Sequence, residues 1–370
     1  MKQRFKKHVA LILISLMLLS LIGCGKPAST ETTTTTETAV TEAPASISDA
    51  ATTADSTSAD ASEEGSDAQT VYPVTVTDQA GREVTIEKEP ESIVSGYYIS
   101  TSLLLALGLK DKVTGIEAKA SKRPIYKLAA PEFLELPNVG TAKEFDLETC
   151  ASLSPELVIL PMKLKDAAQS LSELDIPVLL VNPESEAQLE QMIELVSTAT
   201  NTKENADALL SYIDEKKEML EKDLSGVDAK SVYLAGNSSL LSTAGPAMYQ
   251  SGLIELASGK NAASEITDTY WAEISYEQLL AWDPSYIILA SDAEYTPEDV
   301  LNDENLKECT AVKNGNVYAI PGDIEALDSP VPGGILASIW LAGILHPDQV
   351  SADMYTEEKA AFYETFYGIK

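Results

Sequence analysis

Histidine, the side chain that most often serves as a catalytic base, is scarce in this 370-residue chain. The chain has two histidines, His8 and His346. His8 belongs to an N-terminal segment that we expect to be removed, and His346 follows a predicted helix, where we expect it to face solvent. No nucleophile elbow, phosphate-binding loop or dinucleotide-binding glycine motif follows a predicted strand. Because a nucleophile needs a base to activate it, we predict that the protein is not an enzyme.

The sequence also lacks the ligands of a bare metal site. Cys150 and Cys309 lie in apolar or mixed helical segments without CxxC spacing, and we expect both to be small core residues. Two histidines are too few for a histidine-rich zinc or manganese centre. We therefore predict no metal site and no cofactor.

Binding of an organic molecule or a metal complex is the chemistry that the remaining residues allow. In open α/β sheets, ligands bind beyond the carboxyl ends of the strands, near helix N-termini. Aromatic and polar side chains follow several predicted strands, and such a set suits a mid-sized ligand. The alternative for the aromatic residues and lysines is an ordinary place in a loop, in the core or in solvent. The candidates for ligand contact are Tyr97, Tyr98, Lys119, Arg123, Lys163, Ser239, Tyr270, Trp271, Asp323 and Glu325.

Short apolar runs that alternate with helical patterns must position these side chains. Strands that alternate with helices favour a parallel sheet with helices on its faces. Residues 186–222 have a helical period without a strand or a proline, which predicts two helices, the second over about 203–224. A hairpin is predicted for 74–77 and 83–86, and strands are predicted at 93–94, 113–116, 157–160 and 178–181.

The alternation resumes after the two helices. It predicts strands at 232–235, 286–289 and 317–320, and then helices over 333–345 and 356–367. We therefore predict an α/β fold of two Rossmann-like lobes with parallel-rich sheets, joined by one long rigid helix. A single large α/β domain is the alternative. The predicted parts are an N-terminal lobe, a connecting helix and a C-terminal lobe, over residues 71–201, 202–225 and 226–370.

One pattern occurs once in each predicted lobe. Residues 145–160 and 274–289 each contain a helix-capping residue, a glutamate two positions later, a short helix, a proline and an apolar strand. The period is far longer than that of a solenoid repeat, so we interpret the pattern as pseudo-symmetry between two lobes. The capping residues and the glutamates are, in order, Asp146, Ser275, Glu148 and Glu277.

The first 70 residues have the composition of an export signal followed by a tether. A basic start and an apolar run up to Ile22 predict a secretory signal over 1–24. Gly23 and Cys24 complete a segment that resembles the lipobox of bacterial lipoproteins. We therefore predict that Cys24 is lipidated and holds the protein outside the cytoplasm, at the cell membrane. Residues 25–70 have no aromatic side chain and are rich in Thr, Ser, Ala and acids, which predicts a disordered stalk.

The chain is strongly acidic, with 58 acidic and 26 basic side chains and a formal net charge of −32. Residues 71–370 hold 49 of the acidic side chains, so the folded part is itself acidic. A nucleic-acid-binding protein needs a basic surface for phosphates. We therefore predict no nucleic-acid partner.

Several further motifs, in this order behind a lipobox, resemble the solute-binding lipoproteins of ABC importers for siderophores, haem and cobalamin. The resemblance covers about residues 71–370 and implies two lobes that share one rigid helix. Its motifs are TVTDQAGREVTI at 75–86, NVG at 138–140, DLE at 146–148, LSPELV at 153–158, Trp271 before SYEQ at 275–278, and AVKNGNVY at 311–318.

The resemblance implies a partner and roles for two residues. In this family one surface glutamate of each lobe docks against arginines of the two permease subunits, and Glu148 and Glu277 match those positions. The alternative is that both simply favour the helix dipole, because each lies in a first helical turn. We expect the protein to be a monomer that binds a permease dimer.

The resemblance also implies the class of ligand. We predict an iron complex, either a siderophore or haem, or a corrinoid. Haem would lack a histidine ligand here, an anionic siderophore would depend on Arg123 and the lysines, and a corrinoid would need the aromatic residues. The alternatives are a molybdate-like oxyanion bound by the same fold, and an envelope lipoprotein that senses or scaffolds without transport.

Overall fold

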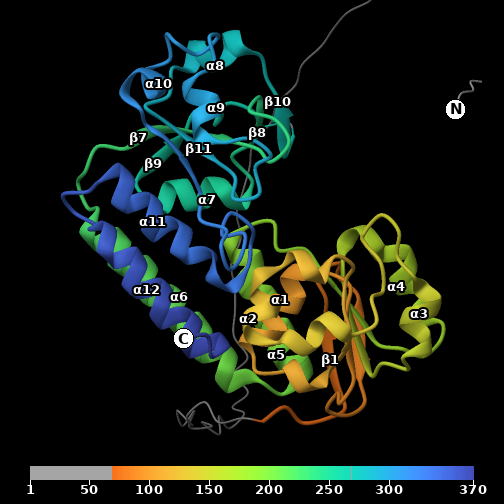
Figure 1. The fold of residues 1–370 in the computed structure, drawn as a ribbon. Coiled ribbons are helices and arrows are strands. Elements are labelled where there is room, and N and C mark those ends of the chain that lie inside the picture. The colour runs from red at the N-terminus through yellow and green to blue at the C-terminus, as the bar shows by residue number, and fades with distance from the viewer. Residues whose placement is uncertain (1–68, 268) are drawn as a thin grey trace, which may run out of the picture. The chain divides into compact units, whose positions relative to one another are not determined.

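The computed structural model describes residues 69–267 and 269–370 (Figure 1). The predicted signal sequence, Cys24 and the predicted stalk up to residue 68 lie outside these residues. Thr70 is held against helix α5 (Glu186–Thr200), because its N–H donates to Asn201 Oδ1 at 2.8 Å and its hydroxyl donates to the Thr198 carbonyl at 3.0 Å. The described residues belong to one compact unit, so the limits at 201 and 226 stay predictions.

The first sheet consists of four short apolar strands. Every residue of its strands β3, β5 and β6 is buried, as expected for a parallel sheet that is covered on both faces. The four predicted strands of this region are thereby confirmed. The parallel order is β4-β3-β5-β6, with β3 (Ile93–Ser95), β4 (Val113–Gly115), β5 (Leu157–Pro161) and β6 (Val178–Val181).

Helices and a hairpin accompany the first sheet. Strands β1 (Val74–Thr77) and β2 (Glu83–Ile86) form the predicted antiparallel hairpin. Arg82 pairs with Asp78 at 2.7 Å and donates to the Val178 carbonyl at 2.8 Å, which fixes the hairpin to β6. The other helical segments are α1 (Tyr98–Ala106), α2 (Pro124–Ala129), α3 (Leu147–Ser152), α4 (Lys165–Ser172), and the 3-10 turns η1 (Lys110–Lys112), η2 (Ala120–Lys122), η3 (Pro131–Glu135) and η4 (Met162–Leu164).

The second sheet repeats this architecture. Its parallel order is β12-β11-β7-β9, with β7 (Lys230–Ala235), β9 (Gly259–Asn261), β11 (Tyr286–Leu289) and β12 (Val317–Ala319). A separate antiparallel pair, β8 (Ser242–Ala244) with β10 (Trp271–Glu273), was not predicted, because both strands have three residues and no apolar run. The helical segments are α7 (Tyr249–Leu256), α8 (Tyr276–Trp282), α9 (Pro297–Leu301), α10 (Thr310–Asn314), η5 (Pro332–Gly334), α11 (Ile335–Leu345) and α12 (Ala352–Tyr367). We call each sheet with its helices the N-terminal or the C-terminal lobe.

One helix of 21 residues, α6 (Lys203–Asp223), lies between the two sheets in the chain, close to the predicted range. It runs beside α12 (Figure 1). Tyr212 contacts Phe362 with ring centroids 5.3 Å apart and donates to Glu358 at 2.9 Å, while Lys216 pairs with Glu358 at 3.0 Å. The last helix of the chain thus packs along α6.

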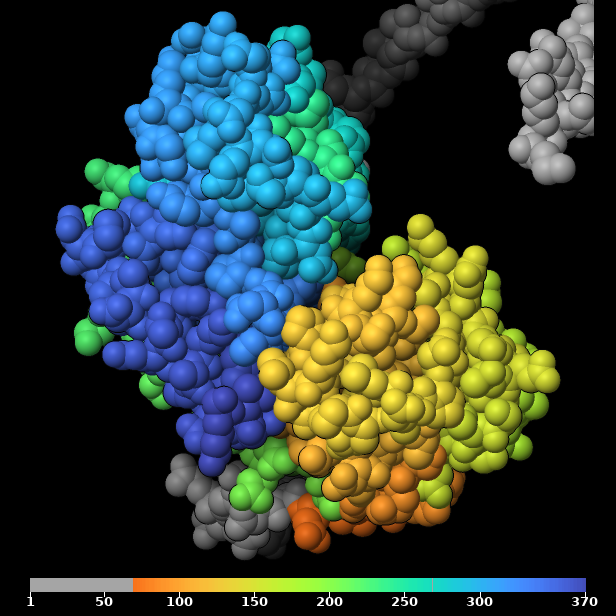
Figure 2. Space-filling model, in the orientation of Figure 1, coloured from red at the N-terminus to blue at the C-terminus, as the bar shows by residue number. Residues whose placement is uncertain are grey.

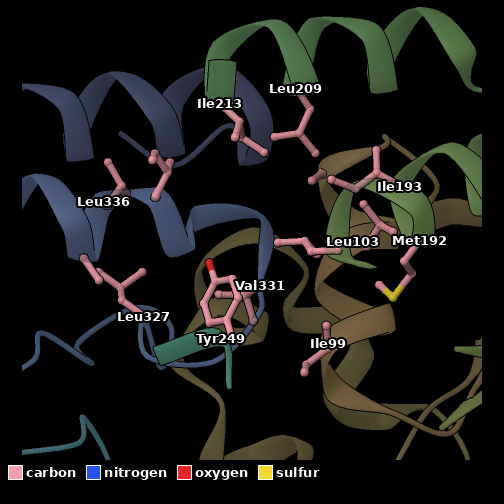
Figure 3. Close-up of a cluster of buried hydrophobic side chains, with 14 of the residues drawn as sticks. Ile99, Leu103, Met192, Ile193, Leu209, Ile213, Tyr249, Leu327, Val331 and Leu336 are labelled. Atoms are coloured by element: carbon pink, nitrogen blue, oxygen red, sulfur yellow. The ribbon is translucent and has the colours of Figure 1, made fainter. Parts of the chain in front are cut away.

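A continuous apolar core crosses from one lobe to the other (Figure 3). Ile99 and Leu103 of α1 belong to the same buried cluster as Leu209 of α6 and Leu336 of α11. Gly334 allows Tyr249 to enter this cluster, because a Cβ at Gly334 would lie 2.1 Å from the Tyr249 hydroxyl. The lobes therefore share apolar side chains that neither could bury alone.

No helix among residues 69–267 and 269–370 has the length and apolar character needed to cross a membrane.

Replacing Leu103 by alanine tests whether this core couples the two lobes. All three tryptophans of the chain lie between residues 271 and 340, so their fluorescence reports on the C-terminal lobe, whereas Leu103 is a fully buried residue of the N-terminal lobe. We expect Leu103→Ala to lower the free energy of unfolding by about 2–5 kcal/mol, as for other buried leucines, when urea unfolding is followed by tryptophan fluorescence. The control Leu174→Ala, at a side chain that is 55% exposed, should change stability by less than about 0.5 kcal/mol. An unchanged tryptophan transition in Leu103→Ala would contradict a shared core.

Candidate functional site

Three of the predicted ligand residues lie together where the chain leaves the first sheet. After β3 the chain passes Gly96, where a Cβ would lie 2.6 Å from Leu160 Cδ2, and reaches Tyr97, the N-cap of α1. The Tyr97 and Tyr98 rings meet edge to face with centroids 5.3 Å apart. The Arg123 guanidinium carbon lies 3.9 Å from the centroid of the Tyr98 ring. This is a cation–π contact at the carboxyl end of the sheet, as the strand-end argument predicts.

The loop that follows β12 brings the C-terminal lobe against this cluster. The Tyr98 hydroxyl donates to Ser329 Oγ at 2.9 Å, and the Ile125 N–H donates to the Ile324 carbonyl at 3.1 Å. We call this contact line between the lobes the seam. Figure 2 shows the two parts of the chain touching along it, beside a notch that opens to one side. The other contacts across the seam are the hydrogen bond from Ser102 to Glu325 and the ion pair of Arg123 with Asp292 at 3.8 Å.

A small cavity lies at the seam and is lined from both lobes. Its volume is about 30 Å³, and its lining includes Tyr98, Arg123, Asp292 and Glu325. One water molecule takes up about this volume in the liquid, whereas pockets for organic ligands are typically about 300–1,000 Å³. A ligand larger than a water molecule therefore has to widen the seam or lie in the notch beside it.

Three buried carboxyl groups lie close to the seam. Glu117 accepts hydrogen bonds from Tyr126 and Thr101, each at 2.7 Å. Burial raises the pKa of Glu117 and of Asp328 above the ordinary values of these groups. Burial also raises the pKa of Glu325 to about 7, against the opposing effect of hydrogen bonds from Ser102, Tyr363 and Tyr367. With a pKa of about 7, the Glu325 carboxyl group is about half protonated near neutral pH.

Among the other predicted ligand residues, Glu325 lines the same cavity as Tyr98 and Arg123, and the rest do not join this cluster. Tyr270 and Trp271 are 55% and 40% exposed at the start of β10, and the Trp271 ring packs over Gly236, where a Cβ would lie 3.0 Å from it. Asp323 pairs with Lys359 of α12, and Glu325 is buried beside Tyr363. Lys119 is exposed as the N-cap of η2, Lys163 is exposed within η4, and the Ser239 hydroxyl accepts from the N–H of Leu241.

The expectation that His346 faces solvent is wrong. His346 is the C-cap of α11, as predicted for a helix end, but it is only 5% exposed. Its Nε2 lies 3.2 Å from the Ser258 carbonyl, which packs the ring against the C-terminal lobe. Cys150 and Cys309 are fully buried core residues, as predicted.

Asp292 is a charged residue of the seam that sequence reasoning missed. It follows Ser291, which comes directly after strand β11 and the buried Ala290, so its place beyond a strand end was a usable signal. Its significance depends on Arg123, which is far away in the sequence and in the other lobe. Pairing of this kind is invisible to a search for local motifs.

The two glutamates of the repeated pattern occupy equivalent positions. Glu148 lies in the first turn of α3, which Asp146 caps by accepting from the Thr149 N–H at 2.9 Å. Glu277 lies in the first turn of α8, which Ser275 caps by accepting from the Gln278 N–H at 3.2 Å. Both glutamates are exposed. The pattern that the sequence repeats in the two predicted lobes is therefore present in the structure, as two short helices that are capped in the same way.

Several proteins that are similar to this chain are described as binding proteins. The sequence model of a family described as periplasmic binding protein matches residues 93–324. An uncharacterised ABC transporter substrate-binding lipoprotein of Bacillus subtilis is 27% identical, over 89% of this chain and 94% of its own. The molybdate-binding protein of Haemophilus influenzae is 24% identical, over 79% of this chain and 90% of its own. Other relatives, at 23% and 21% identity, are named as a petrobactin-binding protein of B. subtilis and a cobalamin-binding protein of Halobacterium salinarum.

A solved structure has the same fold over most of its length. The periplasmic solute-binding protein of Veillonella parvula superimposes with a TM-score of 0.71 at 26% identity, covering 80% of this chain and 93% of the other. The match extends through both sheets, since it covers far more than either of them.

The buried carboxyl group of Glu325 should make stability depend on pH. The pKa of Glu325 is higher in the folded state, at about 7, than in the unfolded chain. Its contribution to stability is therefore fully present below the pKa of the unfolded state, and it is lost as the pH rises through the pKa of the folded state. Glu325→Gln removes the cost of ionisation. We expect this variant to be more stable than the wild type at pH 8, by up to about 3 kcal/mol, and to differ little at pH 4.5.

Urea unfolding of both proteins at the two pH values measures the difference. The control Asp323→Asn, at the exposed neighbouring carboxylate, should show a much smaller change with pH. If the difference in unfolding free energy between Glu325→Gln and the wild type is the same at pH 4.5 and at pH 8, ionisation of Glu325 is not the cause of the pH dependence.

Proposed function

We propose that this chain, which belongs to the periplasmic binding protein family, is the tethered receptor of an ABC importer and captures an iron complex or a corrinoid between its lobes. The family consists of proteins that bind substrates for transport. The iron complex or corrinoid, the docking residues and the lipid anchor are the parts that we propose for this chain.

The observation that carries the proposal is the aromatic and cationic cluster at the seam. Tyr97, Tyr98 and Arg123 present two aromatic rings and a guanidinium at the carboxyl end of the first sheet. Aromatic faces and one cation suit a conjugated metal complex, which offers flat surfaces and negatively charged oxygens. Tyr270 and Trp271 supply exposed aromatic surface from the C-terminal lobe.

The histidine content favours a ligand that brings its own complete metal coordination. His346 is the single histidine in the described part of the chain, and it is buried against Ser258. The seam therefore offers a haem iron no imidazole from the described residues. A siderophore complex or a corrinoid, in which the ligand itself surrounds the metal, fits such a site better.

The shared core supports modest movement of the lobes during capture. Wide separation would expose the apolar side chains that both lobes bury together, at a cost of about 25 cal/mol for each Å². A small widening at the seam breaks only polar contacts, such as those from Tyr98 to Ser329 and from Arg123 to Asp292. Lipidation at Cys24 and a stalk over 25–70 would let the receptor act outside the cytoplasm while it stays near the permease.

A ligand screen tests the proposed substrate class. We expect a ferric siderophore complex or cyanocobalamin to raise the unfolding temperature of the purified protein in proportion to its saturation, because it binds the folded state alone. Haem and molybdate are the comparison arms, and visible absorbance checks that the coloured ligands copurify. A shift with molybdate alone would replace the proposed ligand by an oxyanion, and no shift with any arm would contradict the proposal.

Glu148 and Glu277 are the proposed docking residues for the permease. They are exposed and lie at equivalent positions in two similar lobes, which suits a partner with two-fold symmetry. Charge pairs of this kind act mainly on orientation and encounter rate. A purely local role in the helix dipole would apply equally to other acids in first helical turns.

The variant Glu148→Ala with Glu277→Ala should bind ligand normally and lose uptake by at least about tenfold in vesicles that contain the permease. The matched control is Asp166→Ala with Glu298→Ala, since both residues are exposed acids in the first turns of α4 and α9. The control should retain uptake. Equal loss of uptake in both double variants would assign the effect to net charge, and full uptake in the first would remove the docking role.

A further inference from the structure

We propose that Asp292 competes with an anionic ligand for the guanidinium of Arg123, which it holds until a more highly charged group of the ligand replaces it. This inference rests on the proposed function, because it names the charge class of the ligand that binds at the same seam. The ion pair of the two residues spans the lobes, so the exchange also couples ligand charge to contact across the seam.

One face of the Arg123 guanidinium packs on the Tyr98 ring, while its N–H donors have no acceptor among the described residues. The Tyr98 ring covers the guanidinium at 3.9 Å, and the Tyr98 hydroxyl is in turn bound to Ser329. Within residues 69–267 and 269–370, the guanidinium has no hydrogen-bond acceptor, and its ion pair with Asp292 Oδ2 is 3.8 Å long. A guanidinium has five N–H donors and prefers two parallel hydrogen bonds to an anion at about 2.7–2.9 Å. The Asp292 contact does not use this capacity.

Arg123 is also the arginine that remains available in the described residues. The other one, Arg82, is bound by Asp78 and the Val178 carbonyl. In an acidic protein, an arginine stacked on a tyrosine and short of acceptors is a prepared subsite for an anion. The side chain of Arg123 is 30% exposed and lines the cavity at the seam, so a ligand that widens the seam can reach it.

Asp292 is positioned by the buried carboxyl group of Asp328. The Ser291 N–H donates to Asp328 Oδ1 at 3.3 Å, and the Ser291 hydroxyl donates to the same oxygen. Gly322 packs against this point, because a Cβ there would lie 3.0 Å from Ser291 Cβ. The backbone before Asp292 is therefore fixed, while the Asp292 side chain itself is 59% exposed. Its carboxylate stands beside Arg123 and can turn toward solvent when another anion arrives.

The arrangement makes the ligand compete with Asp292 for Arg123. A neutral ligand has no anionic group for Arg123, so it leaves the pair with Asp292 in place. An anionic ligand exchanges one pair for another that has two short hydrogen bonds. Exposed pairs are weak, so the competition is modest, and removing Asp292 should tighten an anionic ligand by about 3- to 10-fold.

Equilibrium titrations of the purified full chain test this inference. The probes are a ferric catecholate complex, which is anionic, cyanocobalamin, which is neutral, and molybdate, a small dianion. We expect Asp292→Asn to bind the ferric catecholate about 3- to 10-fold more tightly and Arg123→Gln to bind it about 10- to 100-fold more weakly. Asp292→Asn should change the affinity for cyanocobalamin by no more than about 2-fold, because a neutral ligand does not compete with Asp292 for Arg123. The control Glu298→Gln removes one negative charge from an exposed site in the same lobe and should leave all affinities unchanged.

The outcomes separate this inference from the proposed function. Binding of cyanocobalamin without binding of the ferric catecholate would overturn the inference and leave the proposed function in place. Equal tightening in Asp292→Asn and Glu298→Gln would also overturn it, because net charge would then be the cause. Molybdate that binds alone, more tightly in Asp292→Asn and more weakly in Arg123→Gln, would support the competition with Asp292 while contradicting the proposed ligand. Failure of every probe to bind would contradict the proposed function, and the inference with it.

Discussion

The apolar core that the two lobes share is the contact on which the rest of this structure depends. It joins α1 and α5 of the N-terminal lobe to α6, α7 and α11, so the sheets cannot move far apart without exposing buried side chains. Helix α1 contributes side chains both to this core and to the seam. Ile99 and Leu103 of α1 are buried in the core, while Tyr98 and Ser102, one position before each, contact the loop that follows β12. Apolar packing on one side of α1 therefore sets the register of the polar contacts on the adjacent side.

Electrostatics at the seam follow from this burial. A carboxyl group that packing removes from water keeps its proton to higher pH unless a positive charge lies beside it. Glu325 has hydroxyl partners, and Arg123 opposes its shift only weakly, so its pKa rises. Asp292 lies outside the packed region and stays exposed, free to pair with Arg123. Glu325 and Asp292 both lie at the seam, but apolar packing buries Glu325 and leaves Asp292 exposed. They therefore differ in their exposure to water and in their partners.

Much of the architecture could be predicted from local sequence. The four strands of the first sheet are short apolar runs, and the buried environment of a parallel sheet makes such runs distinctive. Asp146 and Ser275 cap their helices because a capping side chain bonds an N–H only three residues away. Strands β8 and β10 were missed, since each has three residues and depends on its partner for its conformation.

The sequence by itself determined the α/β alternation, the helix caps, the equivalent glutamates and the aromatic and cationic residues that follow β3 and β4. The strands, caps and strand-end positions, with Tyr97 and Tyr98 after β3 and Arg123 after β4, depend on neighbours within a few residues, where steric and hydrogen-bonding preferences act directly. Tertiary structure alone decided that Glu325 is buried against Ser102, that Asp292 pairs with Arg123, and that His346 turns away from solvent. The partners in these contacts lie 223, 169 and 88 residues apart in the chain. Their meeting depends on how two lobes pack over a common core, and no local pattern records that packing.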